Sequence, residues 1–209
     1  MGRKALTTKL TANDLTLLRG ERCLFKGLNF ALSPGELLIL EGQNGSGKTS
    51  LMRALAGLLE FETGEVKWDG VSVRKNRQAF HGSLVWMAHR VGLKADLTLV
   101  ENLSFEASLR AQSSADLDDV MTRLGISRLK RLPVRSLSAG QQRRVALARM
   151  VLAKAQLWLM DEPFTNLDRD GRTLVMKLVS EHLSRGGMCI MAAHQDVEVD
   201  ATVHKVVLQ

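Results

Sequence analysis

GQNGSGKT, at residues 42–49, determines which kind of fold this chain adopts. It follows the apolar run Glu36 to Glu41, which predicts a buried strand, and it opens the stretch Lys48 to Leu58, whose spacing predicts a helix ending near Gly57. A glycine-rich turn between a strand and a helix is the phosphate-loop pattern, because backbone N–H groups and the helix N-terminus converge there on phosphate oxygens. The predicted nucleotide-binding residues are Gly42, Gln43, Asn44, Gly45, Ser46, Gly47, Lys48, Thr49 and Ser50.

A second apolar run, Leu157 to Met160, ends in two acidic residues, Asp161 and Glu162. We expect this buried strand to bring Asp161 beside the phosphate loop, where Asp161 and the Thr49 hydroxyl would hold Mg²⁺. Lys48 would reach the β- and γ-phosphates of the nucleotide. Glu162 points elsewhere as the chain leaves the strand, which suits polarisation of an attacking water. The predicted cofactor is therefore Mg²⁺, bound with ATP as the substrate.

A third motif, LSAGQ at residues 137–141, predicts a helix start. Ser138 with Gln141 three residues later forms a capping box ahead of an amphipathic helix. A helix N-terminus with a serine cap and a flexible glycine can also receive a phosphate. One chain needs only one such receptor for its own ATP, so the second is expected to cover the γ-phosphate of a nucleotide held by another subunit. The residues predicted to act in this way are Ser138, Ala139, Gly140 and Gln141.

Around these motifs, short strands alternate with helical stretches. Strands are predicted within residues 9–41 and at 65–68, 83–88, 157–160, 188–192 and 202–208, and helices at 48–58, 99–131, 139–154 and 171–185. Such alternation predicts an α/β fold with a mainly parallel core sheet and helices on both faces. The early strands should form a separate antiparallel layer. We expect a single domain over residues 1–209, with a helical lobe inserted at about residues 99–135.

Composition limits the class of protein. The chain has 209 residues, is 45% hydrophobic and carries a net charge of +7. No apolar run reaches the roughly 18 residues of a membrane span and no secretory signal is present, so we expect a cytoplasmic location. Cys23 and Cys189 lack metal-site spacing and are expected to be buried thiols. Either polyanion binding or a solvated surface would explain the basic clusters Arg74, Lys75 and Arg77; Arg128, Lys130 and Arg131; and Arg143 and Arg144.

The order of these motifs, followed by a histidine at position 194, resembles the ATP-binding cassette (ABC) ATPases over about residues 9–208. The resemblance implies a homodimer in which two cassettes sandwich two ATP molecules head to tail. It implies that Glu162 is the base for hydrolysis and that His194 contacts the γ-phosphate. It also implies that Asp168, at the end of the segment TNLD, takes part in communication between the two sites.

A closer resemblance is to the ATP-binding subunits of cytochrome c maturation systems. It rests on GLK at 92–94, LT at 97–98, ENL at 101–103, LSAGQQRR at 137–144, WLMDEPFT at 158–165 and HQD at 194–196. This resemblance implies integral membrane subunits of that system as partners and a peripheral position on the cytoplasmic face of the bacterial inner membrane. It further implies a role in haem handling or in release of a haem-loaded chaperone, with the cargo left open.

Two positions depart from the pattern of the ABC family. The adenine-stacking aromatic, normally just before a turn like that at Gly20, is replaced by Arg19. A guanidinium can stack on a base, so ATP binding by Arg19 with loose base selectivity is expected. The glutamine that normally links Mg²⁺ to the helical lobe should lie near residues 89–90, which are His89 and Arg90. What completes the Mg²⁺ site in its place stays open.

Three other classes of protein share parts of this pattern. Another small ABC transporter would share many of the same motifs. A nucleic-acid-associated ABC ATPase is favoured only by the basic charge, and the chain is too short for two cassettes. With no Tyr, 6 Phe and 3 Trp, it also offers few stacking platforms, so no direct nucleic-acid partner is expected. A small-molecule kinase would not need the motif at residues 138–141.

Overall fold

A computed structural model describes residues 10–109, 116–193 and 197–209 of the chain. Its central layer is a five-stranded sheet in the order β6-β7-β8-β3-β9, and each of these strand pairs is parallel. The strands are β3 (Glu36–Glu41), β6 (Leu84–Met87), β7 (Leu157–Asp161), β8 (Met188–Ala192) and β9 (Thr202–Val207). The predicted parallel core sheet is confirmed.

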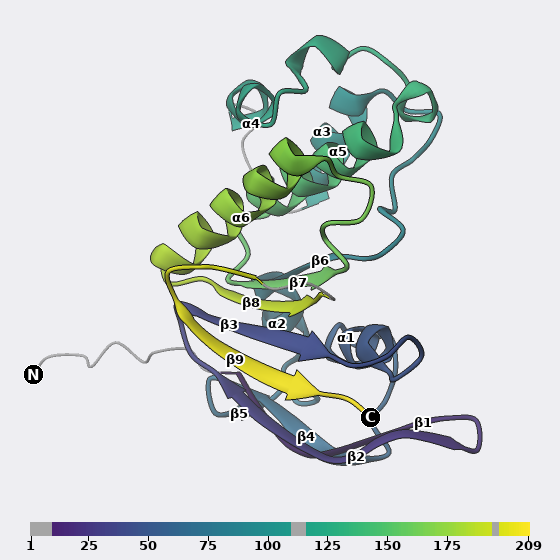
Figure 1. Cartoon of the computed structure of the whole chain (residues 1–209), viewed down its shortest axis with the longest axis vertical. Helices are drawn as coiled ribbons and strands as arrows, with labels where there is room; N and C mark the ends of the chain where they lie inside the picture. Colours follow the sequence, from purple (N-terminus) through teal and green to yellow (C-terminus); the bar gives the residue numbers. More distant parts are fainter. Residues whose placement is uncertain (1–9, 110–115, 194–196) are drawn as a thin grey trace, which may run out of the picture.

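A second sheet lies below the first in Figure 1 and is antiparallel, in the order β2-β1-β4-β5. Its strands are β1 (Leu10–Arg19), β2 (Arg22–Leu32), β4 (Thr63–Trp68) and β5 (Val71–Ser72). The predicted separate layer is therefore present, and β4 and β5 also belong to it. Cys23 lies beside the β1–β2 turn and is exposed, so the expectation of a buried thiol is wrong for Cys23 and right for Cys189.

Helices cover both faces of the parallel sheet. Helices α1 (Lys48–Leu55) and α2 (Arg77–Ser83) contribute to the apolar cluster between the two sheets. On the opposite face lie α5 (Ala139–Leu152) and α6 (Arg169–Ser184). Beyond them, at the top of Figure 1, lie α3 (Leu99–Leu109), α4 (Leu117–Arg123) and the short 3₁₀ helices η2 (Ser127–Leu129) and η3 (Val134–Ser136). None of the helices in the described ranges combines the length and apolar character that a bilayer crossing requires.

Successive residues of the central strands serve two different cores, because side chains alternate across a sheet. In β7, Leu157 and Leu159 pack toward the antiparallel sheet and α1, whereas Trp158 and Met160 pack toward α5 and α6. In β3, Leu38 and Leu40 face the first cluster, and Leu37 and Ile39 face the second. Strands buried on both faces in this way read as continuous apolar runs, which is why they could be found from the sequence.

Several boundaries differ from the predictions. Helix α1 ends at Leu55 instead of Leu58, and Gly57 follows at φ +76°, a backbone conformation that ends a helix. The expected helical run over residues 99–131 is divided into α3, α4 and η2. Helix α2 and strand β5 were not predicted, because both are too short for a periodic pattern. Asn76 at the N-cap, accepting from Ala79 N at 3.4 Å, was the available signal for α2.

Candidate functional site

The phosphate loop connects the end of β3 to the start of α1. Gly42, Gly45 and Gly47 have φ values of +141°, +85° and +105°, which side chains disfavour. A Cβ on Gly42 would also lie 2.4 Å from the Leu208 carbonyl oxygen, so only glycine fits there. These glycines set the tight loop that leads the backbone into the helix N-terminus.

Two polar side chains of this loop are buried. Lys48 is 6% exposed, and its Nζ donates to the carbonyl oxygens of Gly42 at 2.6 Å and Gln43 at 3.0 Å. Ser46 is 8% exposed, and within the described part of the chain its Oγ has no hydrogen-bond partner. A buried hydroxyl without a partner is costly, and a ligand oxygen would satisfy it. The loop therefore has the cation and the donors that a bound phosphate needs.

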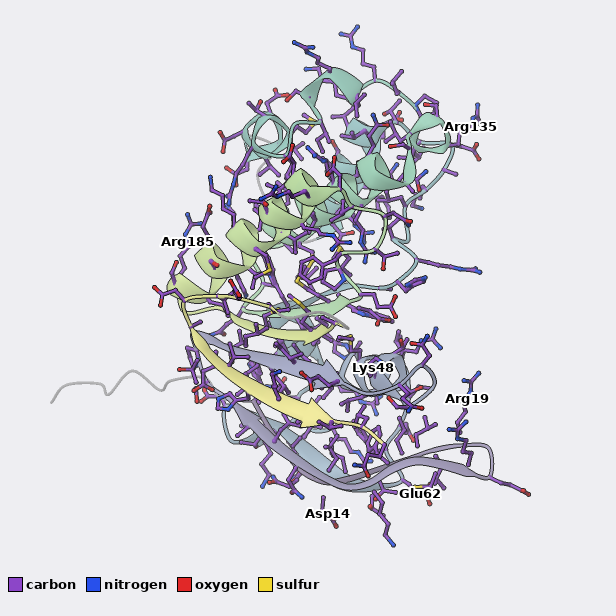
Figure 2. All side chains as sticks on the ribbon, in the orientation of Figure 1. Asp14, Arg19, Lys48, Glu62, Arg135 and Arg185 are labelled. Atoms are coloured by element: carbon purple, nitrogen blue, oxygen red, sulfur yellow. The ribbon has the colours of Figure 1, made fainter. Side chains whose placement is uncertain are left out.

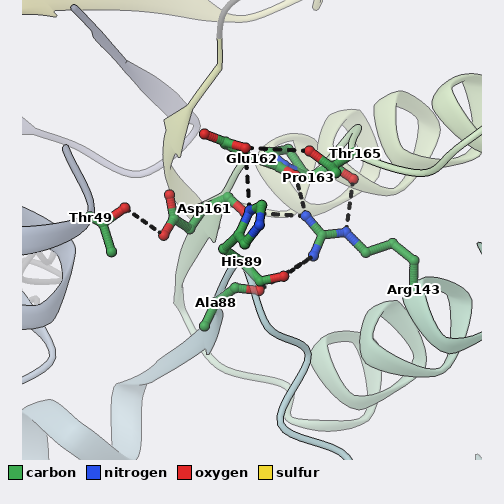
Figure 3. Close-up of polar contacts among 8 residues, drawn as sticks. All are labelled: Thr49, Ala88, His89, Arg143, Asp161, Glu162, Pro163 and Thr165. Carbon is green, nitrogen blue, oxygen red and sulfur yellow. Dashed lines mark hydrogen bonds and ion pairs between the residues drawn. The ribbon is translucent and has the colours of Figure 1, made fainter. Parts of the chain in front are cut away.

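Asp161 and Thr49 meet across the site, as Figure 3 shows. The Thr49 hydroxyl donates to Asp161 Oδ2 at 2.9 Å, and Asp161 is 1% exposed. Their meeting follows from the sheet order, because β3 and β7 are both parallel neighbours of β8 and end at the same edge. A hydroxyl beside a carboxylate is a hard-oxygen donor set of the kind that Mg²⁺ prefers. The residues present therefore fit Mg²⁺.

Glu162 follows directly and has φ +49°, an uncommon conformation for a residue with a side chain. Its N–H donates to the Ala192 carbonyl at 3.0 Å. Its Oε2 lies 3.3 Å from Nδ1 of His89 and accepts from the Thr165 hydroxyl at 3.4 Å. After the bend that follows β7, the Glu162 carboxylate thus lies between His89 and Thr165 (Figure 3).

Arg143 is part of this site, although its charge and that of its neighbour Arg144 predict a basic cluster at the surface or on a polyanion. Arg143 is 3% exposed, and burial lowers the pKa of its guanidinium, while the charges of Asp161 and Glu162 act in the opposite direction. It donates to backbone carbonyls at the ends of β6 and β7. The surface interpretation is therefore wrong for Arg143. Its charge alone does not distinguish it from Arg144, and the burial of most of α5 becomes known only from the structure.

The motif at residues 138–141 begins α5 with the predicted capping box. Ser138 Oγ accepts from Gln141 N at 3.2 Å, and Gln141 Oε1 accepts from Ser138 N at 2.9 Å. Ser138, Gly140 and Gln141 line an open hollow of about 420 Å³ together with Asn166 and Asp168. Asp168 also caps α6 through Gly171 N at 2.8 Å. The described lining of this hollow contains no residue of the phosphate loop.

Arg19 is exposed at the end of β1, and in Figure 2 it extends toward the side of the molecule that carries Lys48. Arg90 lines a second hollow of about 410 Å³ between the loop that follows β6 and the start of α5. His194, expected at the γ-phosphate, lies outside the described residues.

Comparisons with known proteins identify the family and the fold. The family model described as ABC transporter matches residues 25–165. The cytochrome c biogenesis ATP-binding export protein CcmA of Methylococcus capsulatus is 46% identical over 91% of this chain and 93% of its own length. The protein of the same name from Vibrio parahaemolyticus is 43% identical over 92% and 95%. A putative ABC transporter ATP-binding protein from Pyrococcus furiosus shares the fold, with a TM-score of 0.81, 24% identity and coverage of 96% and 97%.

Proposed function

We propose a function from one premise: this chain belongs to the ABC transporter family, as one of its ATP-binding subunits. It is an ATPase, and its ATP hydrolysis energises the ABC system of cytochrome c biogenesis. The observation that carries the hydrolytic part is the contact of Thr49 with Asp161, which brings the phosphate loop to the acidic end of β7. The biological part rests on the CcmA relatives, which are 46% and 43% identical over about nine-tenths of the chain.

Each residue of the site has a proposed task in hydrolysis. Lys48 and the loop N–H groups bind the β- and γ-phosphates, and Ser46 donates to a phosphate oxygen. Thr49 and Asp161 hold Mg²⁺, which when bound neutralises charge on the phosphate oxygens. Glu162 accepts a proton from the attacking water, and His194 contacts the γ-phosphate. Arg19 lies against the adenine.

The second phosphate receptor implies a homodimer. Ser138, Ala139, Gly140 and Gln141 lie at an exposed helix start, in a hollow whose described lining includes no residue of their own chain's phosphate loop. We assign this surface to the nucleotide of a second copy, so that each site is complete only in the dimer. Asp168, in the same hollow, links the two sites.

The proposed partners are the integral membrane subunits of the cytochrome c maturation system, met on the cytoplasmic face of the bacterial inner membrane. The hollow lined by the loop 89–95 and the start of α5 is their docking place, with the helical lobe at about residues 99–135 beside it. The acidic side chains nearby, Asp96 and Glu101, already have partners within the chain. Asp96 is paired with Arg135, and Glu101 Oε2 accepts from Thr98 N at 2.7 Å. No direct nucleic-acid partner is proposed.

Haem staining tests this function in a strain whose only copy carries Lys48→Ala. We expect covalent c-type cytochromes to disappear while b-type cytochromes persist, because haem synthesis itself is untouched. A matched strain with Lys67→Ala, a surface lysine paired with Glu65 at 3.1 Å, should keep both types. If Lys48→Ala abolishes ATP hydrolysis in vitro yet c-type cytochromes mature normally, the chain serves another small ABC transporter, which is the second candidate.

A further inference from the structure

The guanidinium of Arg143, on α5, joins two other segments of the chain. Its Nε donates to the carbonyl of Pro163 at 3.2 Å, and Nη2 donates to those of Asp161, at 3.2 Å, and Glu162. Its Nη1 donates to the carbonyls of Ala88 and His89, both at 3.3 Å. The five N–H donors of the rigid fork thus face five carbonyl oxygens (Figure 3).

These carbonyls come together because of strand register. Strands β6 and β7 are parallel neighbours, with Met87 opposite Met160. The residues that follow, 88–89 on one strand and 161–163 on the other, therefore leave the sheet side by side. Arg143 approaches both from the first turns of α5 and ties them together.

A direct consequence is the contact between His89 and Glu162. The imidazole Nδ1 lies 3.3 Å from Glu162 Oε2, and its own backbone carbonyl is fixed by Arg143. The Glu162 backbone, in its disfavoured conformation at φ +49°, is fixed by the same guanidinium. The carboxylate and the imidazole are thus presented to each other by one buried side chain.

We propose that Arg143 and His89 are positioning residues for Glu162: Arg143 holds the backbone that aims the carboxylate, and His89 holds the carboxylate itself. The proposal rests on the proposed role of Glu162 as the base for hydrolysis. Lysine cannot replace Arg143, because one ammonium does not reach five carbonyls in a fork. Glutamine can replace His89 in part, because its amide also carries an N–H donor.

Steady-state hydrolysis by the isolated chain tests His89, measured with binding of a fluorescent ATP analogue. We expect His89→Ala to lower kcat about tenfold, which is less than the loss on removing a general base. KM and the affinity for the analogue should stay within about twofold of wild type. His89→Gln should recover most of kcat. The matched control is His204→Ala, which removes a similar pair, His204 Nε2 to Glu36 Oε2 at 3.2 Å, at the other end of β3. Unchanged kcat in His89→Ala, an equal loss in His204→Ala, or weakened ATP binding that accounts for the loss overturns the assignment of His89.

Arg143→Lys and Arg143→Met test the buried side chain, with thermal unfolding followed in parallel. At least one should fold, bind the ATP analogue with normal affinity and lose more than tenfold in kcat. Arg123→Lys is the control, because Arg123 makes a partly buried pair with Glu181 far from the site. Normal kcat in a folded variant, or failure of both variants to fold, overturns the positioning role.

Glu162→Gln separates this proposal from the function on which it rests. In that background neither His89→Ala nor Arg143→Lys should lower the residual rate further. If Glu162→Gln alone keeps wild-type turnover, the proposed base is wrong. If Glu162→Gln is inactive but the positioning variants are fully active, only the present inference fails.

Discussion

Substitution of Ser138 separates a structural from a functional role of the same hydroxyl. Ser138 is exposed, and its Oγ accepts from Gln141 N at 3.2 Å as the N-cap of α5. Loss of such a cap costs about 1 kcal/mol, so Ser138→Ala should lower the melting temperature by roughly 2–4 °C in a chain of this size. Aspartate is as good an N-cap as serine and its charge favours a helix N-terminus, so Ser138→Asp should keep the stability of the wild type.

In the rate of ATP hydrolysis, the two Ser138 variants should rank differently than they do in stability. A hydrogen bond from a hydroxyl to a charged phosphate contributes about 1.5–3 kcal/mol, which corresponds to roughly ten- to a hundredfold in rate. Ser138→Ala should lose about that much turnover. Ser138→Asp should lose more, because its carboxylate would face the γ-phosphate of the other subunit.

The assay is steady-state ATP hydrolysis with thermal unfolding of the same preparations. Asn76→Ala is the control, since it removes the N-cap of α2, with an Asn76 Oδ1 to Ala79 N distance of 3.4 Å, away from both phosphate receptors. It should lower stability and leave turnover unchanged. Wild-type turnover in Ser138→Asp would refute the reasoning, since the hydroxyl would then be a helix cap alone.

Glu162→Gln should abolish steady-state hydrolysis, with a loss of about a hundredfold or more, while ATP binding persists and an ATP-bound dimer accumulates in size-exclusion chromatography. Specific activity should rise with protein concentration if each site needs two chains, and a constant value on dilution into the monomeric range would argue against shared sites. Arg19 against the adenine predicts that hydrolysis of GTP falls less far behind that of ATP than in cassettes with an aromatic residue there, and that Arg19→Tyr increases the preference for ATP. Burial lowers the pKa of His182 below its usual 6.5, so the unfolded chain binds the proton more readily and stability should fall as pH drops through about 6.5. Thermal unfolding at pH 5 and 7.5 checks this, and His182→Gln should reduce the difference.

The parts of the site that lie on long apolar patterns could be predicted from the sequence. The run from Leu157 to Met160 identified β7, and its carboxyl end was expected at the phosphate loop, where Asp161 accepts from Thr49. The carboxyl ends of parallel strands lie at the same edge of a sheet. The prediction therefore required only that the two runs be recognised as parallel strands. The roles of these residues in hydrolysis remain predictions.

Register and burial could not be predicted in the same way. The contact of His89 with Glu162 depends on Met87 lying opposite Met160, and nothing in the sequence specifies which residues of two distant strands are paired. Arg143 resembles its neighbour Arg144 in charge, yet only Arg143 is buried among carbonyls. Short elements such as α2 lack enough residues for a period to emerge.

Successive side chains of β7 pack into two different cores. The number of residues in this strand is therefore constrained more strongly than the choice among apolar residues at each position. An insertion or deletion of one residue in this strand would exchange the sides on which Leu157 and Trp158 pack, and it would move Asp161 out of reach of Thr49. Substitutions of one apolar residue by another keep both relationships. At the β1–β2 turn, where Gly20 and Glu21 are exposed, an added residue disturbs neither core. Homologous chains should therefore vary in length at this turn and keep a constant number of residues in β7.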